Sequence, residues 1–306
     1  MTLLVVGSVA LDSVSTPFGQ TADALGGSAV HFAVAASLLH PVRVVGVVGD
    51  DYPIGELERL STRGIDWSGV EHATGESFRW KGKYSYDLQS RETLETRLGV
   101  FADFHPRLPP GAEAARFVFL GNIDPELQLS VLDQVTAPVL VACDTMNYWI
   151  QSKRETLMKL LARVDMLMVN DSEARELSGD WNIHRAGRWI LERGPKRVVI
   201  KQGEFGALLL EAGRTFHIPA FPLEEVFDPT GAGDAFAGGF MGYLARCGNI
   251  GMVEMRRAMV YGSVMGSYSV SGFDIKGFEG VTNADIEARV RQFTDLVHIP
   301  AAEPLP

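Results

Sequence analysis

The sequence predicts an α/β protein with a mostly parallel central sheet and helices on both faces. Two observations carry this prediction. Short β-branched runs alternate with longer helical patterns, as in strands joined by helical crossovers. Several of these runs are apolar throughout, which is typical of strands that are buried on both faces. A third observation adds a smaller part, because residues 71–104 are polar and aromatic and interrupt the alternation.

The elements follow in chain order. Strands of the central sheet are expected at 3–7, 42–51, 116–123, 138–145, 164–170 and 197–203. Residues 27–40 form a helix of small residues, and "PELQLSVLDQV" and "AGRWILERG" are helical stretches between later strands. The alternation around "FRWKGKYSYDL" predicts exposed strands of a subsidiary sheet. By itself, that segment fits either a lid over a site or a surface excursion.

Composition limits the classes of partner. The net charge is −10 and the isoelectric point is about 5.2, so we expect no binding to nucleic acid or to an anionic membrane. The two cysteines, Cys143 and Cys247, lie in apolar sequence, which favours buried thiols in a reducing compartment. The first residues are typical of a strand rather than a signal peptide, and no apolar run reaches the ~20 residues of a membrane span. We therefore expect a cytoplasmic protein.

The stretch "DPTGAGDAFAGGF" at 228–240 is the strongest chemical signal. A turn enters a helix here, so the N–H groups of Gly231, Ala232 and Gly233 are available to an anion. A Walker A loop is excluded because no lysine follows, and a dinucleotide fingerprint would lie after the first strand. Asp234 either complements the helix dipole or accepts a proton beside a bound phosphate.

This stretch resembles the second signature of the ribokinase-like (PfkB) family of sugar and nucleoside kinases. The resemblance implies a single kinase domain over 1–306, with a three-layer ribokinase-like fold and a small β-sheet lid. It makes Asp234 the catalytic base and the amides of Gly231, Ala232 and Gly233 the anion hole for the γ-phosphate. Thr230 would then lie on the nucleotide side. Asp228 would shape the loop, with a metal-binding role as the alternative.

Two further segments match the family on the nucleotide side. "VNDSEA" resembles its N-x-x-E motif, so Asn170 and Glu173 are expected to organise Mg²⁺ through water; a helix capping box is the alternative. "VIKQGEFGALLL" resembles the segment that lines the nucleotide phosphates. The matching residues are Lys201, Gly203 and Gly206, and an ordinary hairpin turn is the alternative.

The acceptor side is matched by the N-terminal part of the chain. "LGGSAVHFAVAASLL" resembles the family's first signature, in which Gly26 and Gly27 precede the helix that contacts substrate. Asp12 matches the aspartate that binds substrate hydroxyls. The family usually has asparagine where this chain has His31, so His31 is either a substrate contact or a packed helix residue.

The lid strands are expected from about 12–24 and 71–104. In the family such a lid excludes water and often also forms a dimer contact, so a homodimer through the lid is implied. Arg79, Lys81 and Lys83 are candidates to meet substrate or phosphate. A solvated, charged strand face is the alternative for each of them.

Together these motifs predict a kinase that uses ATP and Mg²⁺ to phosphorylate a hydroxyl of a sugar, expected to be a primary CH2OH group. Dependence on a monovalent cation stays open. The aromatic lid leaves a nucleoside as an alternative acceptor, because its base would stack on aromatic side chains. A catalytically silent ligand-binding relative is a second alternative. A dehydrogenase that binds NAD(H) is disfavoured, because the early glycine fingerprint is missing.

Overall fold

The computed structural model describes residues 2–298. Its main element is a nine-stranded sheet, in which all neighbours from β5 to β11 are parallel and the two strands at one edge, β12 and β13, are antiparallel. In spatial order the strands are β13 (Arg214–Ile218), β12 (Ala207–Glu211), β11 (Arg197–Lys201), β10 (Met166–Asn170), β9 (Leu140–Asp144), β8 (Phe117–Leu120), β1 (Leu3–Val6), β4 (Val42–Val48) and β5 (Ile65–His72). The six strands expected from sequence and the α/β class are confirmed.

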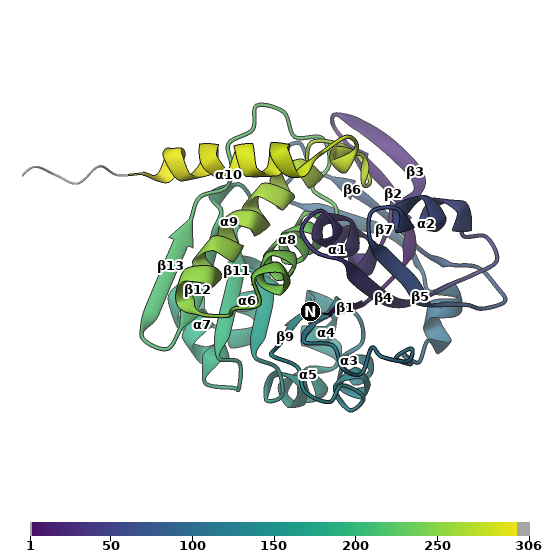
Figure 1. The fold of residues 1–306 in the computed structure, drawn as a ribbon, viewed down its shortest axis with the longest axis horizontal. Helices are drawn as coiled ribbons and strands as arrows, with labels where there is room; N and C mark the ends of the chain where they lie inside the picture. Colours follow the sequence, from purple (N-terminus) through teal and green to yellow (C-terminus); the bar gives the residue numbers. More distant parts are fainter. Residues whose placement is uncertain (1, 299–306) are drawn as a thin grey trace, which may run out of the picture.

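Helices cover both faces of this sheet, because successive side chains of a strand point to opposite sides. Leu3 and Val5 of β1 pack into one apolar cluster, and Leu4 and Val6 pack into the other. The first face is covered by α1 (Ser28–Ser37), α2 (Ile54–Ser61), α8 (Ala232–Cys247), α9 (Met252–Ser269) and α10 (Asn283–Val297), and Figure 1 shows α1, α8, α9 and α10 together. The second face is covered by α3 (Pro125–Leu132), α4 (Asn147–Ser152), α5 (Arg154–Leu161), α6 (Asp171–Ser178) and α7 (Ile183–Leu191).

A separate small sheet lies beside the main one. Its order is β3 (Gly19–Gly26), β2 (Ala10–Thr16), β6 (Phe78–Tyr84) and β7 (Arg91–Arg97), and only the β2–β6 pair is parallel. The segments expected to form the lid therefore do supply a small sheet. Within the expected range 71–104, the strands of this sheet occupy only β6 and β7. The first residues of that segment end β5 of the main sheet instead. Short 3-10 helices lie at η1 (Gly99–Asp103), η2 (Gly203–Phe205) and η3 (Lys276–Phe278).

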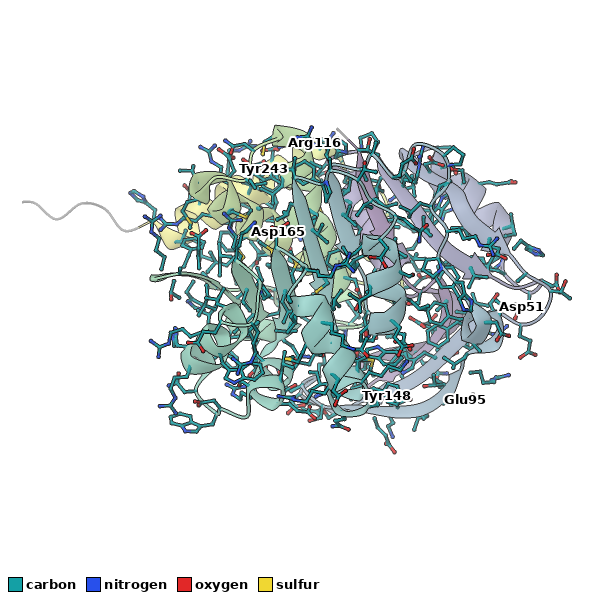
Figure 2. The ribbon with its side chains drawn as sticks, turned by 90° about the horizontal axis from the view of Figure 1, so that it is seen from below. Asp51, Glu95, Arg116, Tyr148, Asp165 and Tyr243 are labelled. Carbon is teal, nitrogen blue, oxygen red and sulfur yellow. The ribbon has the colours of Figure 1, made fainter. Side chains whose placement is uncertain are left out.

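The carboxyl ends of the parallel strands share one edge of the main sheet, because these strands run in the same direction. In Figure 2, Arg116 and Asp165, which precede β8 and β10, lie toward the upper edge. Tyr148, which follows β9, lies at the lower edge, and Glu95 of β7 is drawn at that edge as well. Ligands of open α/β sheets bind beyond the carboxyl ends of the strands, so this edge is where a site is expected.

The cysteines only partly meet the expectation from sequence. Cys143, in β9, is buried, but Cys247 is exposed. Cys247 ends α8, where its thiol donates to the carbonyl of Leu244, so apolar neighbours in sequence do not place it in the core. Both thiols are free. Among residues 2–298, no helix is long and apolar enough to cross a membrane.

Candidate active site

The glycine-rich loop before α8 has the backbone that its sequence requires. Gly231 is the N-cap residue of α8, and its φ of 73° is in the left-handed region that favours glycine. A Cβ atom at Gly231 would lie 2.3 Å from Cγ of the His31 ring, so there is also no room for one. Upstream, a carboxylate oxygen of Asp228 accepts a hydrogen bond of 2.8 Å from the N–H of Thr230. The loop is therefore held both by its own turn and by α1.

Two amides of this loop point to an anion site. Among the described residues 2–298, no acceptor pairs with the N–H of Gly231 or of Gly233. The N–H of Ala232 donates to the carbonyl of Pro229 at 3.2 Å, so that amide takes part in the turn. Free N–H groups at the first turn of a helix, together with the helix dipole, favour a bound phosphate.

A lysine approaches the loop from another strand. Lys201 ends β11, and a Cβ atom built on Gly233 would lie 2.9 Å from its Nζ. The same Nζ is 3.0 Å from Oδ2 of Asp144, at the end of β9, with side-chain exposures of 15% and 7%. Burial by itself would lower the pKa of Lys201. The negative charges of Asp144, Glu173 and Asp234 raise it by more than burial lowers it, so the net shift is upward. The ammonium group therefore stays charged beside the free amides of the loop.

Asp234 lies in the first turn of α8, where several carboxylates converge. Burial, followed by the negative charge of Asp144, raises its pKa to about 8, although Lys201 opposes the shift. Asp12 and Glu173 also contribute to the rise, so both sides of the site act on this group. A carboxyl group that titrates close to neutral pH can take up and release a proton during catalysis.

Asn170 and Glu173 form a helix capping box at the start of α6. Oδ1 of Asn170 accepts from the N–H of Glu173 at 2.8 Å, and Oε2 of Glu173 accepts from the N–H of Asn170 at 2.8 Å. The capping alternative is therefore confirmed. Burial, and then the charge of Asp144, raises the pKa of Glu173, although Lys201 and the amide of Asn170 oppose the rise. Carboxylate and amide oxygens are donor types that Mg²⁺ takes, so the magnesium role of these two residues stays a prediction.

The expected nucleotide-side segment forms the turn between β11 and β12. Gly203 begins η2 with a φ of 57°, and Gly206 has a φ of 97°. A Cβ atom at Gly206 would lie 2.0 Å from the carbonyl oxygen of Ile218, so this turn requires glycine. Between the two glycines, Glu204 accepts a hydrogen bond of 3.0 Å from Gln89, which lies between β6 and β7. The hairpin-turn alternative is confirmed, and contact with a nucleotide stays a prediction.

The acceptor-side residues also lie together. Asp12 is 8% exposed, and its Oδ2 accepts from the N–H of Gly27 at 3.3 Å. A Cβ atom at Gly26 would lie 2.1 Å from the same oxygen, so the two glycines allow the carboxylate to lie against the backbone. Burial raises the pKa of Asp12 to about 7, although the amide of Gly27 lowers it. Asp228 and Asp274 add to the rise.

His31 is packed inside α1 with its ring against Gly231. It is 3% exposed, and its Nδ1 has no hydrogen-bond partner among the described residues. Burial lowers its pKa to about 4, so the imidazole is neutral at physiological pH. His31 is therefore a packed helix residue in this structure. Because its Nδ1 has no partner among the described residues, a contact between this atom and substrate stays a prediction.

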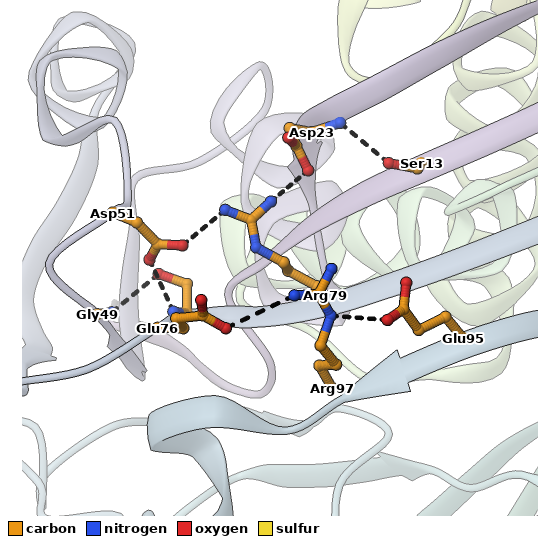
Figure 3. Close-up of polar contacts among 9 residues, drawn as sticks. Ser13, Asp23, Gly49, Asp51, Glu76, Arg79, Glu95 and Arg97 are labelled. Atoms are coloured by element: carbon orange, nitrogen blue, oxygen red, sulfur yellow. Dashed lines mark hydrogen bonds and ion pairs between the residues drawn. The ribbon is translucent and has the colours of Figure 1, made fainter.

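The basic residues expected on the lid do not all turn toward the site. Arg79 forms ion pairs with Asp23 and Asp51, in the latter case at 2.6 Å, and Figure 3 shows the guanidinium group between the two carboxylates. Lys81 and Lys83 are exposed and alternate with the buried residues of β6. For both lysines the solvated-face alternative holds.

Two residues of the site were missed by sequence reasoning. Asp144 follows four apolar residues and is buried, so a carboxylate at the carboxyl end of a parallel strand was the available signal. Tyr84, also buried, forms a 3.2 Å hydrogen bond between its hydroxyl and that of Thr230. Nothing in its local sequence separates it from the other aromatic residues of the small sheet.

Free amides at a helix start, a buried lysine and a buried carboxyl group with a raised pKa are the parts that a phosphotransferase with an alcohol acceptor uses. Comparison with known proteins agrees with this class. The model of the pfkB family of carbohydrate kinases matches residues 4–273, and the chain belongs to that family. A cytidine kinase of Thermococcus kodakarensis is 31% identical over 268 residues, covering 84% of this chain and 95% of that protein.

Solved structures show the same fold. The nucleoside kinase of Burkholderia thailandensis in complex with inosine has a TM-score of 0.79 at 22% identity, covering 97% of this chain and 98% of that one. A putative ribokinase II from E. coli in complex with ATP and Mg²⁺ has a TM-score of 0.78 at 18% identity, covering 95% and 99%. The three-layer ribokinase-like fold, with its small additional sheet, is thus confirmed.

Proposed function

We propose that this protein transfers the γ-phosphoryl group of ATP to a primary hydroxyl group on the sugar part of its acceptor. The observation that carries the proposal is the position of Asp234 at the start of α8, beside the free amides of Gly231 and Gly233 and near the ammonium of Lys201. A base and a set of anion donors are what phosphoryl transfer to an alcohol requires.

In this mechanism each residue has a separate task. The hydroxyl groups of the acceptor are held by Asp12, which is fixed on Gly27. Asp234 takes the proton of the attacking hydroxyl group in its ionised form, which is the minor form at neutral pH because its pKa is raised to about 8. The oxygen then bonds to the γ-phosphorus, and the bond from that phosphorus to the oxygen of ADP breaks. The amides of the loop and Lys201 offset the negative charge on the phosphoryl group as it moves. Gly203, Gly206 and Thr230 would lie along the remaining phosphates.

Asn170 and Glu173 would hold Mg²⁺ through water. When bound, the metal neutralises phosphate charge and orients the leaving group. Asp228 shapes the loop by accepting a hydrogen bond from the N–H of Thr230, with a metal-binding role as the alternative. We also propose a cytoplasmic location, consistent with the two free cysteines, and a homodimer through the small sheet.

The acceptor is either a free sugar or a nucleoside. A free sugar follows from the signatures of a carbohydrate kinase family. A nucleoside is favoured by the near full-length relative that is a cytidine kinase. Both acceptors carry the hydroxyl groups that Asp12 would bind, so the central mechanism is the same for the two.

The test is ADP release from ATP and Mg²⁺ with a panel of sugars and nucleosides. Replacing Asp234 with Asn should lower kcat by about 10²–10⁴-fold, because the base is lost. ATP affinity, measured by calorimetry, should stay within about twofold because the amides and Lys201 remain. Turnover of Asp234→Asn at the wild-type rate would overturn the role of this residue. If no acceptor stimulates ADP release by the wild type, the catalytically silent ligand-binding alternative is favoured instead.

A further inference from the structure

One aromatic side chain of the small sheet, Trp80, lies over the backbone of a glycine on its own strand. A Cβ atom built on Gly82 would lie 2.1 Å from Cη2 and 2.3 Å from Cζ2 of Trp80, two residues earlier on β6. The indole therefore covers the backbone of Gly82, and a larger residue at that position would displace it. The indole N–H donates to the hydroxyl of Thr93 at 3.3 Å, and the guanidinium of Arg91 lies 5.4 Å from the ring centroid.

The face that carries this ring is the face of the acceptor site. Trp80 pairs with Asp12 in the parallel β2–β6 register, and paired residues of parallel strands point to the same side. Tyr84, four residues along β6 and therefore also on that side, reaches Thr230 of the phosphate-binding loop. Lys81 and Lys83, on the other side of the strand, are exposed.

Core packing does not account for the indole. Trp80 is half-buried and belongs to neither of the two apolar clusters formed by the described residues, although Trp67 packs against the first of them. Its ring is fixed by a hydroxyl, a guanidinium and a bare glycine backbone rather than by apolar side chains. An aromatic surface that is held in place but not covered by the core is a feature of ligand sites.

We propose that the Trp80 indole over Gly82 is the platform on which the planar base of a nucleoside acceptor stacks while Asp12 holds its ribose. This inference rests on the proposed kinase function and names the acceptor class. The ring lies over a residue two positions beyond the partner of Asp12, roughly 6–7 Å along the strand. In this proposal the sugar is held at Asp12, and an attached second ring extends along the strand to that surface. A nucleoside has such a ring and a free pentose does not.

The test compares Trp80→Ala with Trp181→Ala across nucleosides and free sugars. Trp181 is a matched control because it is 76% exposed and also has an arginine, Arg185, 5.4 Å from its ring centroid. Trp80→Ala should raise KM for nucleosides by about tenfold to a hundredfold, the usual worth of one stacked base. KM for ATP and kcat should change little, Trp80→Phe should retain most of the affinity, and Trp181→Ala should match the wild type.

A second variant tests the geometry without removing the aromatic ring. Gly82→Ala should lift the indole and raise KM for nucleosides in the same direction. Nucleoside binding, followed by quenching of tryptophan fluorescence, needs no turnover and should lose most of its signal in Trp80→Phe. The platform is overturned if Trp80→Ala leaves nucleoside KM unchanged, if it weakens all acceptors and ATP equally, or if the wild type phosphorylates only free sugars. The last result leaves the proposed kinase function intact, whereas absence of ADP release with every acceptor overturns that function instead.

Discussion

The phosphate side and the acceptor side of this site are built differently. On the phosphate side, backbone amides of α8 and side chains at the ends of β9 and β11 meet on the main sheet, with Lys201 3.0 Å from Asp144. On the acceptor side, Asp12 and Trp80 come from neighbouring strands of the small sheet and are paired in register. We propose that the main sheet carries the phosphoryl-transfer chemistry and that the small sheet determines which acceptor is bound.

The largest expected effect tests the phosphate side. Lys201→Met should lower kcat/KM by about 10²–10³-fold, because a charge beside the transferring group is lost. It also leaves Asp144 buried without its partner, which costs stability. The double variant Lys201→Met/Asp144→Asn should regain melting temperature but not activity. If the double variant regained both its melting temperature and its activity, Lys201 and Asp144 would have a structural role only.

Lys196→Met is the control for that experiment. Lys196 also pairs with an aspartate, Asp165, at 2.8 Å, but its side chain is 73% exposed. An exposed pair contributes little, so this variant should keep both its stability and its activity. Steady-state kinetics and thermal unfolding of the three variants and the wild type are the measurements.

A smaller effect is expected on the acceptor side. Asp12→Asn removes the negative charge while keeping the shape, so the hydrogen bond from Gly27 can persist. We expect KM for the acceptor to rise by about tenfold to a hundredfold, because charge-assisted bonds to hydroxyls become neutral ones. KM for ATP should stay nearly constant. If KM for the acceptor and KM for ATP rise by the same factor, Asp12 does not act on acceptor binding alone, which contradicts the proposal.

The smallest expected effect concerns stability and pH. The folded protein holds a proton on Asp234 up to a pKa of about 8, whereas the unfolded chain releases it near 3.8. The unfolded state therefore binds fewer protons in this window, and stability falls as pH rises from about 4 to 8. Asp234→Asn should remove that loss, so its stability advantage over the wild type should widen between pH 5 and pH 8 by up to about 4 kcal/mol, the limit of about 1.4 kcal/mol per pH unit.

Thermal or urea unfolding at pH 5, 6, 7 and 8 measures this difference. Glu58→Gln, at an exposed position of α2, serves as the control for loss of one carboxylate. A gap between Asp234→Asn and the wild type that stays constant across this range would contradict the raised pKa. A gap that grows with pH would support burial among like charges as its cause.

The sequence predicted correctly those features that depend on residues close together in the chain. The parallel strands, the small-residue helix and the loop before α8 follow from apolar runs, glycine positions and a helix start. His31 shows the limit of such predictions. Its position on the helix could be predicted, but its contact with Gly231, 200 residues later, could not. Cys247 shows another limit, since an apolar context did not reveal that it ends a helix at the surface.

The sequence by itself determined the fold class, the family resemblance and the identity of Asp234 as the candidate base, because each depends on residues close together in the chain. The tertiary structure alone decided that Lys201 lies against Gly233, that Asp144 pairs with it and that Trp80 lies in register with Asp12. These contacts join strands far apart in sequence. Their physical cause is the strand order and register of the two sheets, which burial over the whole chain selects and no short spacing encodes.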